Sequence, residues 1–66
     1  MKLTKKENPF DVREGQKWKS KDERRQRKFS VMEIKRLQGG VFAVVDYGDL
    51  ISVINLKRFD RYIKVK

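Results

Sequence analysis

Lysine and arginine side chains are concentrated in one short stretch of this 66-residue chain, between Gly15 and Phe29. Lysines alternate with other residues around Trp18, and arginines follow after the acidic pair Asp22 and Glu23. Residues 13–28 carry +5 of the total net charge of +9. Seven positions make up the candidate binding stretch: Lys17, Lys19, Lys21, Arg24, Arg25, Arg27 and Lys28.

The spacing of these cations suits contact with phosphate groups. Alternate residues of a strand share a face, so Lys17, Lys19 and Lys21 line one face while Trp18 takes the other. Arginine adds a planar fork that grips two oxygens. Lysines also protect exposed sheet edges from pairing with other chains, and a charged face can simply be solvated. Seven cations exceed what edge protection requires, so we favour a binding surface.

The aromatic residues divide into two predicted groups. A small domain needs large side chains to fill its core, and Trp18 is the only tryptophan. We therefore predict that it is buried rather than stacked on a base, and that Phe29, Phe42 and Phe59 are core residues too. Tyr47 lies beside the Gly48-Asp49 turn and Tyr62 lies among cations. These two tyrosines are the candidate aromatic contacts of a ligand.

The residue types required for most enzyme chemistry are absent. The chain has no cysteine and no histidine, so the usual general base and the strongest nucleophile are missing. It also has no phosphate-binding loop and no glycine-rich dinucleotide motif. Asp46 and Asp49 flank Gly48, where a role in the turn is favoured over a cation site. We expect a protein that is not an enzyme, with no metal, no cofactor and no small-molecule substrate.

Length and hydropathy predict a single domain without a membrane span. Residues 1–9 are polar and end in Asn8-Pro9, which predicts a flexible basic arm before one folded domain at 10–66. No apolar stretch approaches the roughly 18 residues of a membrane span, and the N-terminus lacks the apolar segment of a signal peptide. The absence of cysteine fits a reducing cytoplasm.

Short apolar runs separated by turn residues predict an all-β fold. Strands are expected near 16–21, 28–37, 41–47, 50–56 and 61–66, with a helical turn at 56–59 before the last strand. A helix is the alternative for 28–37, whose inner positions change parity near Met32 and Glu33, as at a β-bulge or a helical turn. The run from Val41 to Tyr47 is apolar on both parities, which predicts a central strand covered on both sides. Together the elements predict a small five-stranded barrel of the SH3-like type.

One spacing pattern resembles a known group of proteins. The pattern G-x-x-W-x-x-x-D-x-R occurs as Gly15, Trp18, Asp22 and Arg24, and it is followed by Phe29-x-Val31, the run INLKRF at 54–59, Tyr62 and Val65. This is similar to small single-domain proteins of bacteriophages and their bacterial hosts, a largely uncharacterised group with an SH3-like β-barrel fold. The resemblance covers about residues 13–65 and implies the fold more than a function. The chain departs from the group's pattern at Glu23, where the group has proline, and at Gln26, where it has glycine.

These observations lead to two functional hypotheses. The first is non-enzymatic nucleic-acid binding through phosphates, with DNA favoured over RNA, as in a small phage accessory or regulatory protein in the cytoplasm of the bacterial host cell. The alternative is an adaptor or inhibitor that docks on an acidic host protein. Assembly with copies of itself is disfavoured because chains of charge +9 repel one another.

Overall fold

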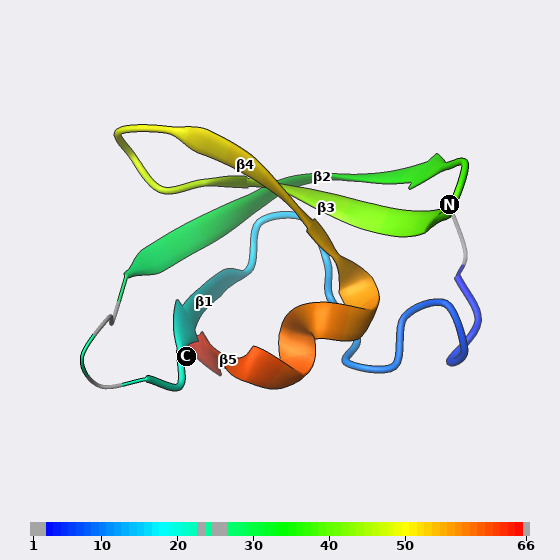
Figure 1. Cartoon of the computed structure of the whole chain (residues 1–66), viewed down its shortest axis with the longest axis horizontal. Coiled ribbons are helices and arrows are strands. Elements are labelled where there is room, and N and C mark those ends of the chain that lie inside the picture. The colour runs from blue at the N-terminus through cyan, green and yellow to red at the C-terminus, as the bar shows by residue number, and fades with distance from the viewer. Residues whose placement is uncertain (1–2, 23, 25–26, 66) are drawn as a thin grey trace.

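The computed structural model describes residues 3–22, 24 and 27–65, and it confirms the predicted all-β fold (Figure 1). The described part contains five antiparallel strands in one sheet and a short 3-10 helix just before the last strand. The strand at 28–37 is present at the predicted bounds, so the helical alternative is wrong. The elements are β1 Lys17–Ser20, β2 Lys28–Leu37, β3 Gly40–Asp46, β4 Ile51–Asn55, η2 Leu56–Arg61 and β5 Tyr62–Val65.

The sheet is bent into an incomplete barrel with two free edges. The strand order is β4-β3-β2-β1-β5, so β4 and β5 each pair on one side only. In Figure 1, β4, β3 and much of β2 lie above β1, β5 and η2, and β2 connects the two parts because it pairs with both β3 and β1. Hydrogen bonds do not close the barrel between β4 and β5. An open side therefore remains between these two strands.

The change of parity in β2 is a β-bulge. The register with β3 shifts between Val31 and Glu33, which leaves Met32 as the extra residue with its side chain 49% exposed. On the other side of β2, the Val31 carbonyl accepts from the Gly15 amide at 2.8 Å. The Val31 amide in turn donates to the Gln16 carbonyl at 2.8 Å. The bulge places Ile34, opposite the buried Ala43, on the inner face of the sheet, whereas Leu37 is 50% exposed.

Glycines with positive φ shape the turns at both ends of β3. Gly39 (φ 99°) and Gly40 (φ 140°) make the turn from β2, as the Gly-Gly pair predicts. At the other end, the carboxylate of Asp46 accepts a hydrogen bond from the Gly48 amide at 2.7 Å. The Tyr47 amide donates to the Leu50 carbonyl at 2.9 Å and closes this turn. Asp46 therefore has the turn role that the sequence favours.

The inner face of the sheet holds the core, and Trp18 belongs to it as predicted. Trp18 is 4% exposed and packs edge-to-face against Phe59, with ring centroids 5.0 Å apart. Phe29 and Phe59 are also buried, as predicted. Phe42 is only half-buried, so its assignment to the core was wrong: its neighbours Val41 and Ala43 point inward, and alternation turns Phe42 outward. The buried residues are Val12, Trp18, Phe29, Val31, Val41, Ala43, Val45, Ile54, Leu56 and Phe59.

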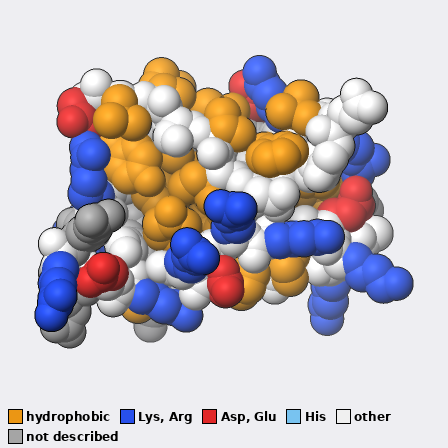
Figure 2. All heavy atoms as spheres, in the orientation of Figure 1, with side chains coloured by type: hydrophobic (Ala, Val, Ile, Leu, Met, Phe, Trp, Pro, Cys, Tyr) orange, Lys and Arg blue, Asp and Glu red, His pale blue; other side chains and the backbone are white. Residues whose placement is uncertain are grey.

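The outer face of β3 and β4 is apolar but uncovered. Val44 lies opposite Val53 on this face, and Ile51 lies opposite Asp46. Ile51 and Val53 are 62% and 53% exposed. The prediction of a strand covered on both sides was therefore wrong, because no second layer packs on this face within the described residues. Figure 2 shows hydrophobic side chains across the upper part of the molecule, over β3 and β4.

The segment before β1 packs along the end of the sheet. The Asn8 side chain forms two hydrogen bonds of 2.8 Å with the backbone of Val12, which is 1% exposed. Leu3 packs against the core, and the carboxylate of Glu7 lies 2.7 Å from the guanidinium of Arg36. The flexibility of residues 1–9 stays a prediction, and residues 1 and 2 lie outside the described part.

Candidate nucleic-acid interface

Three lysines occupy the outward side of β1 and the start of β2. Trp18 and Phe29 are paired across these strands and point inward, so the residues on either side of Trp18 point outward. Lys17 lies opposite Ser30, and Lys19 lies opposite Lys28. Lys17 and Lys28 are exposed, whereas Lys19 is half-buried. We call Lys17, Lys19 and Lys28 the lysine face.

The lysine face concentrates positive charge on two paired strands. Side chains directly opposite each other in an antiparallel pair have Cβ atoms about 4.5–5.5 Å apart, and like charges at this spacing are destabilising. Lys19 and Lys28 stand in this relation. No carboxylate lies within ion-pair distance of any of the three lysines among the described residues. An anion bound between Lys19 and Lys28 would relieve their repulsion.

The other four predicted site residues lie between β1 and β2 along the chain. Lys21 follows β1, and its amide donates to the Arg61 carbonyl at 3.0 Å. The backbone amide of Arg24 donates to the Asp22 carboxylate, and the Arg24 side chain is exposed. Arg25 lies outside the described residues. The structure therefore brings three of the predicted residues together on the lysine face, whereas Lys21 contacts the backbone of Arg61 at the end of η2.

Arg27 connects the loop before β2 to the β3–β4 turn. Its guanidinium lies 2.6 Å from the carboxylate of Asp49. The central carbon (Cζ) of this guanidinium lies 4.9 Å from the centroid of the Tyr47 ring, which makes a cation–π contact. Arg27 is thus already paired, and its contacts fix the position of the tyrosine. Asp49 is used in this ion pair rather than for turn closure.

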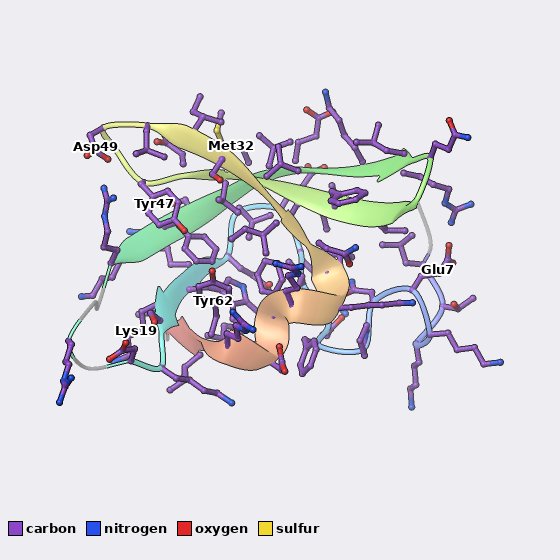
Figure 3. All side chains as sticks on the ribbon, viewed as in Figure 1. Glu7, Lys19, Met32, Tyr47, Asp49 and Tyr62 are labelled. Carbon is purple, nitrogen blue, oxygen red and sulfur yellow. The ribbon has the colours of Figure 1, made fainter. Side chains whose placement is uncertain are left out.

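Tyr47 and Tyr62 lie at the open side of the barrel. Tyr47 follows the end of β3, Tyr62 begins β5, and Figure 3 shows their side chains pointing toward one another. Both rings pack against Phe29, at centroid distances of 5.3 and 5.2 Å. Burial raises the pKa of the Tyr47 phenol above its ordinary value of 10.0, and the neighbouring Tyr62 adds to the rise while Arg27 opposes it. Tyr47 is therefore neutral near pH 7.

Two hollows meet at the tyrosine pair. The first, of about 440 Å³, runs beside β4 and η2. We call it the tyrosine groove, and the second hollow, of about 660 Å³, continues past Lys21 and Arg27. Figure 2 shows lysine and arginine side chains beside hydrophobic ones in the middle of this side of the molecule. The tyrosine groove is lined mainly by Phe42, Tyr47, Val53, Arg58, Arg61 and Tyr62.

Arg58 and Arg61 are site residues that the sequence reasoning missed. They lie three residues apart in η2, and side chains at this spacing eclipse one another in a 3-10 helix. Leu56 and Phe59 have the same spacing and are both buried, so they occupy the inward side of η2. The sequence signal was the spacing of three residues in the run LKRFDR. If Leu56 and Phe59 face the core of a 3-10 helix, Arg58 and Arg61 lie together on a different side of it.

Comparisons with known proteins give no relative from which to transfer a function. The chain matches no family model, no curated protein and no solved structure. The resemblance to the SH3-like phage group stays a prediction. In the described part of the chain, no helix is both long and apolar enough to cross a membrane.

Proposed function

We propose that this protein binds nucleic acid without catalysis, through contacts between its cations and backbone phosphates. The observation that carries the proposal is the lysine face, where Lys19 stands directly opposite Lys28 and no described carboxylate pairs with either. The total charge of +9 supports attraction to a polyanion.

The geometry of a strand matches the repeat of a phosphate backbone. Lys17 and Lys19 are two residues apart on β1, so their Cα atoms lie about 7 Å apart. One strand of DNA carries a phosphate about every 3.4 Å along the helix axis. Because the strand also winds around that axis, neighbouring phosphates are farther apart than this rise, and the two lysines can contact neighbouring phosphates of one strand. Such contacts fix the position of the nucleic acid but carry no base information, so binding should be weakly sequence-specific.

Salt titration tests the electrostatic origin of binding. Each duplex phosphate contact contributes about −0.9 to the slope of log affinity against log salt. Three contacts from the lysine face give a slope of about −2.7, or about 40-fold weaker binding on moving from about 50 to 200 mM salt. Fluorescence anisotropy with labelled duplex DNA, single-stranded DNA and RNA measures this slope for each ligand.

A matched pair of double variants tests the location. Lys19→Gln/Lys28→Gln should weaken binding and flatten the salt slope by about 1.8, because two contacts are lost. Lys5→Gln/Lys6→Gln removes the same charge from exposed positions in the N-terminal segment and should change the slope little. Equal losses of affinity in the two variants would mean that the lysine face contributes only through the net charge of the protein and is not the binding surface. No binding by the parent protein at low salt would refute the proposal.

The second candidate, an adaptor or inhibitor that docks on an acidic host protein, is favoured by one feature. Ile51 and Val53 expose an apolar surface beside the free edge of β4, and phosphate binding does not require it. A partner with acidic groups around an apolar centre would match that surface and the surrounding cations. Ile51→Lys, at a position that does not line the tyrosine groove, should abolish such docking and leave nucleic-acid affinity equal or higher.

A further inference from the structure

The tyrosine groove differs from the lysine face in offering aromatic rings together with cations. Tyr47 and Tyr62 lie at the meeting point of the two hollows, and Phe42 and Val53 extend the groove along β4. Arg58 and Arg61 from η2 border the same groove. Flat apolar surface beside guanidinium groups suits a planar ring that is attached to an anion.

The charge of the tyrosine groove separates it from the hollow that adjoins it. The hollow next to Lys21 also includes Asp22 and Asp60, so its cations are offset by carboxylates. No acidic residue of the described chain lines the tyrosine groove. Within residues 3–22, 24 and 27–65, neither Arg58 nor Arg61 lies within ion-pair distance of a carboxylate. An anionic strand is therefore better accommodated in the tyrosine groove than in its neighbour.

We propose that the tyrosine groove binds unpaired bases of single-stranded nucleic acid, with the rings of Tyr47 and Tyr62 stacking on bases and with Arg58 and Arg61 contacting the adjoining phosphates. This inference rests on the proposed nucleic-acid binding and adds a preference to it. Base–aromatic stacking tolerates any sequence because every base has a π-face. The protein should therefore prefer single strands to duplex without strong base selectivity.

The fold explains how the rings are held ready for stacking. Tyr62 packs against Phe29 and Phe59, with centroids 5.2 and 5.7 Å away, so its ring is fixed from the core side. Tyr47 is held by Phe29 and by the guanidinium of Arg27. A ring that is already positioned loses little conformational entropy when a base stacks on it.

Duplex DNA and acidic peptides fit the groove less well. The bases of a duplex are stacked on one another, so their faces are not available to Tyr47 and Tyr62. An extended peptide would pair with the free edge of β4 through main-chain hydrogen bonds and would leave the aromatic lining without a specific role. The combination of aromatic rings and arginines thus favours bases on a phosphate backbone.

The test compares an oligothymidylate strand with a duplex of the same length. Anisotropy at about 50 mM salt should show tighter binding of the single strand. Tyr62→Ile removes the ring and should weaken single-strand binding about fivefold or more, with little change for duplex. Tyr62→Phe keeps the ring and should retain the preference. Photo-crosslinking of strands that carry 5-iododeoxyuridine should place the crosslinks on Tyr47 or Tyr62.

A charge-matched pair keeps the test decisive if Tyr62→Ile does not fold. Arg58→Gln/Arg61→Gln should reduce single-strand affinity more than duplex affinity. Lys57→Gln/Lys64→Gln removes the same charge from exposed positions that do not line the groove, and it should lower both affinities equally.

The outcomes separate this inference from the proposed function. Duplex binding as tight as single-strand binding, with crosslinks elsewhere, overturns the inference and leaves phosphate binding in place. Absence of nucleic-acid binding at low salt overturns both proposals. If a polyglutamate peptide binds the parent protein but not Arg58→Gln/Arg61→Gln, and nucleic acid does not bind, the groove is a site for acidic peptides instead.

Discussion

On the inner face of β3, Val41, Ala43 and Val45 are buried, whereas Phe42 and Val44 on the outer face of the same strand are only half-buried. All five residues are apolar, so residue type does not separate the two faces. The inner face is covered by the aromatic residues of β1, β2 and η2. The outer face meets solvent. Whether a β3 side chain is buried therefore depends on whether it points into the space that the bent sheet encloses.

We expect the two faces to contribute differently to stability and to binding. Stability should depend on the inner face, because only there do apolar side chains leave water completely. The outer face carries the lysine face over β1 and β2 and the exposed apolar residues over β3 and β4. Substitutions on the outer face should therefore alter binding more than folding.

The largest expected effect comes from the inner face, at Trp18. Trp18→Ala removes the edge-to-face contact with Phe59 and leaves a cavity, so unfolding free energy should fall by about 3–5 kcal/mol. A domain of this size is marginally stable, so this loss is enough to unfold it. Trp18→Phe keeps an aromatic ring and should cost less. Urea unfolding followed by circular dichroism measures both, and a folded Trp18→Ala variant with unchanged stability would contradict the assignment to the core.

A second prediction compares the two faces directly within β3. Ala43 is fully buried between Ile34 and Ile54 on the neighbouring strands, so Ala43→Leu should overpack the core and cost about 1–3 kcal/mol. Val44→Leu, one residue later on the outer face, should change stability by no more than about 0.5 kcal/mol. Thermal unfolding of the two variants measures the two changes in stability. Equal costs would mean that the outer face is covered in solution.

A smaller effect is expected on the outer face at Lys19. Lys19→Gln removes the repulsion with Lys28 and should raise the free energy of unfolding by a few tenths of a kcal/mol, within the range of about 0.2–1 kcal/mol for cross-strand pairs. The gain should shrink near 1 M salt, where the Debye length is about 3 Å. Lys64→Gln is the control, since Lys64 lies opposite Trp18 rather than a cation. A stability loss in Lys19→Gln would argue that the aliphatic part of Lys19 contributes more through packing than its charge costs.

The strands and turns were predictable because their signals are local. Alternation around Trp18, the change of parity at Met32 and the glycine pair before Val41 all act within a few residues of chain. The failures at Phe42 and on the outer face of β3 have a different origin. An apolar run indicates that a strand is able to be buried on both sides, but whether a second layer exists depends on the rest of the fold. Within residues 3–22, 24 and 27–65, no element packs on that face.

The candidate site was predictable only in part for a similar reason. Lys17 and Lys19 share a face because of strand alternation, which the sequence indicates, whereas Lys28 joins them only through the pairing of β1 with β2. Arg58 and Arg61 approach the tyrosines only because η2 brings them to the open side of the barrel. This proximity depends on contacts between segments that are distant in the sequence. The sequence identified Tyr47 and Tyr62 separately, but it did not indicate that they meet.

The smallest expected effect concerns Tyr47, which follows β3 and packs against the core residue Phe29. Burial raises the pKa of its phenol above 10.0, with Tyr62 adding to the rise and Arg27 opposing it. The folded state therefore holds the phenolic proton more tightly than the unfolded state does. The associated stability is fully present below pH 10 and is lost as the pH rises through the folded-state pKa.

Spectrophotometric titration of the phenols isolates this effect, since Tyr47 and Tyr62 are the only two tyrosines. In Tyr62→Phe the remaining phenol is that of Tyr47, and its pKa should move back toward 10.0 because the contribution of Tyr62 is gone. Adding Arg27→Gln to this variant should raise the pKa again, since a nearby cation stabilises the phenolate. Lys57→Gln in the same background removes an equal charge away from Tyr47 and should have little effect. If Arg27→Gln lowers the pKa instead, the guanidinium does not lie over the Tyr47 ring in solution, and the geometry of the tyrosine groove at that end is different.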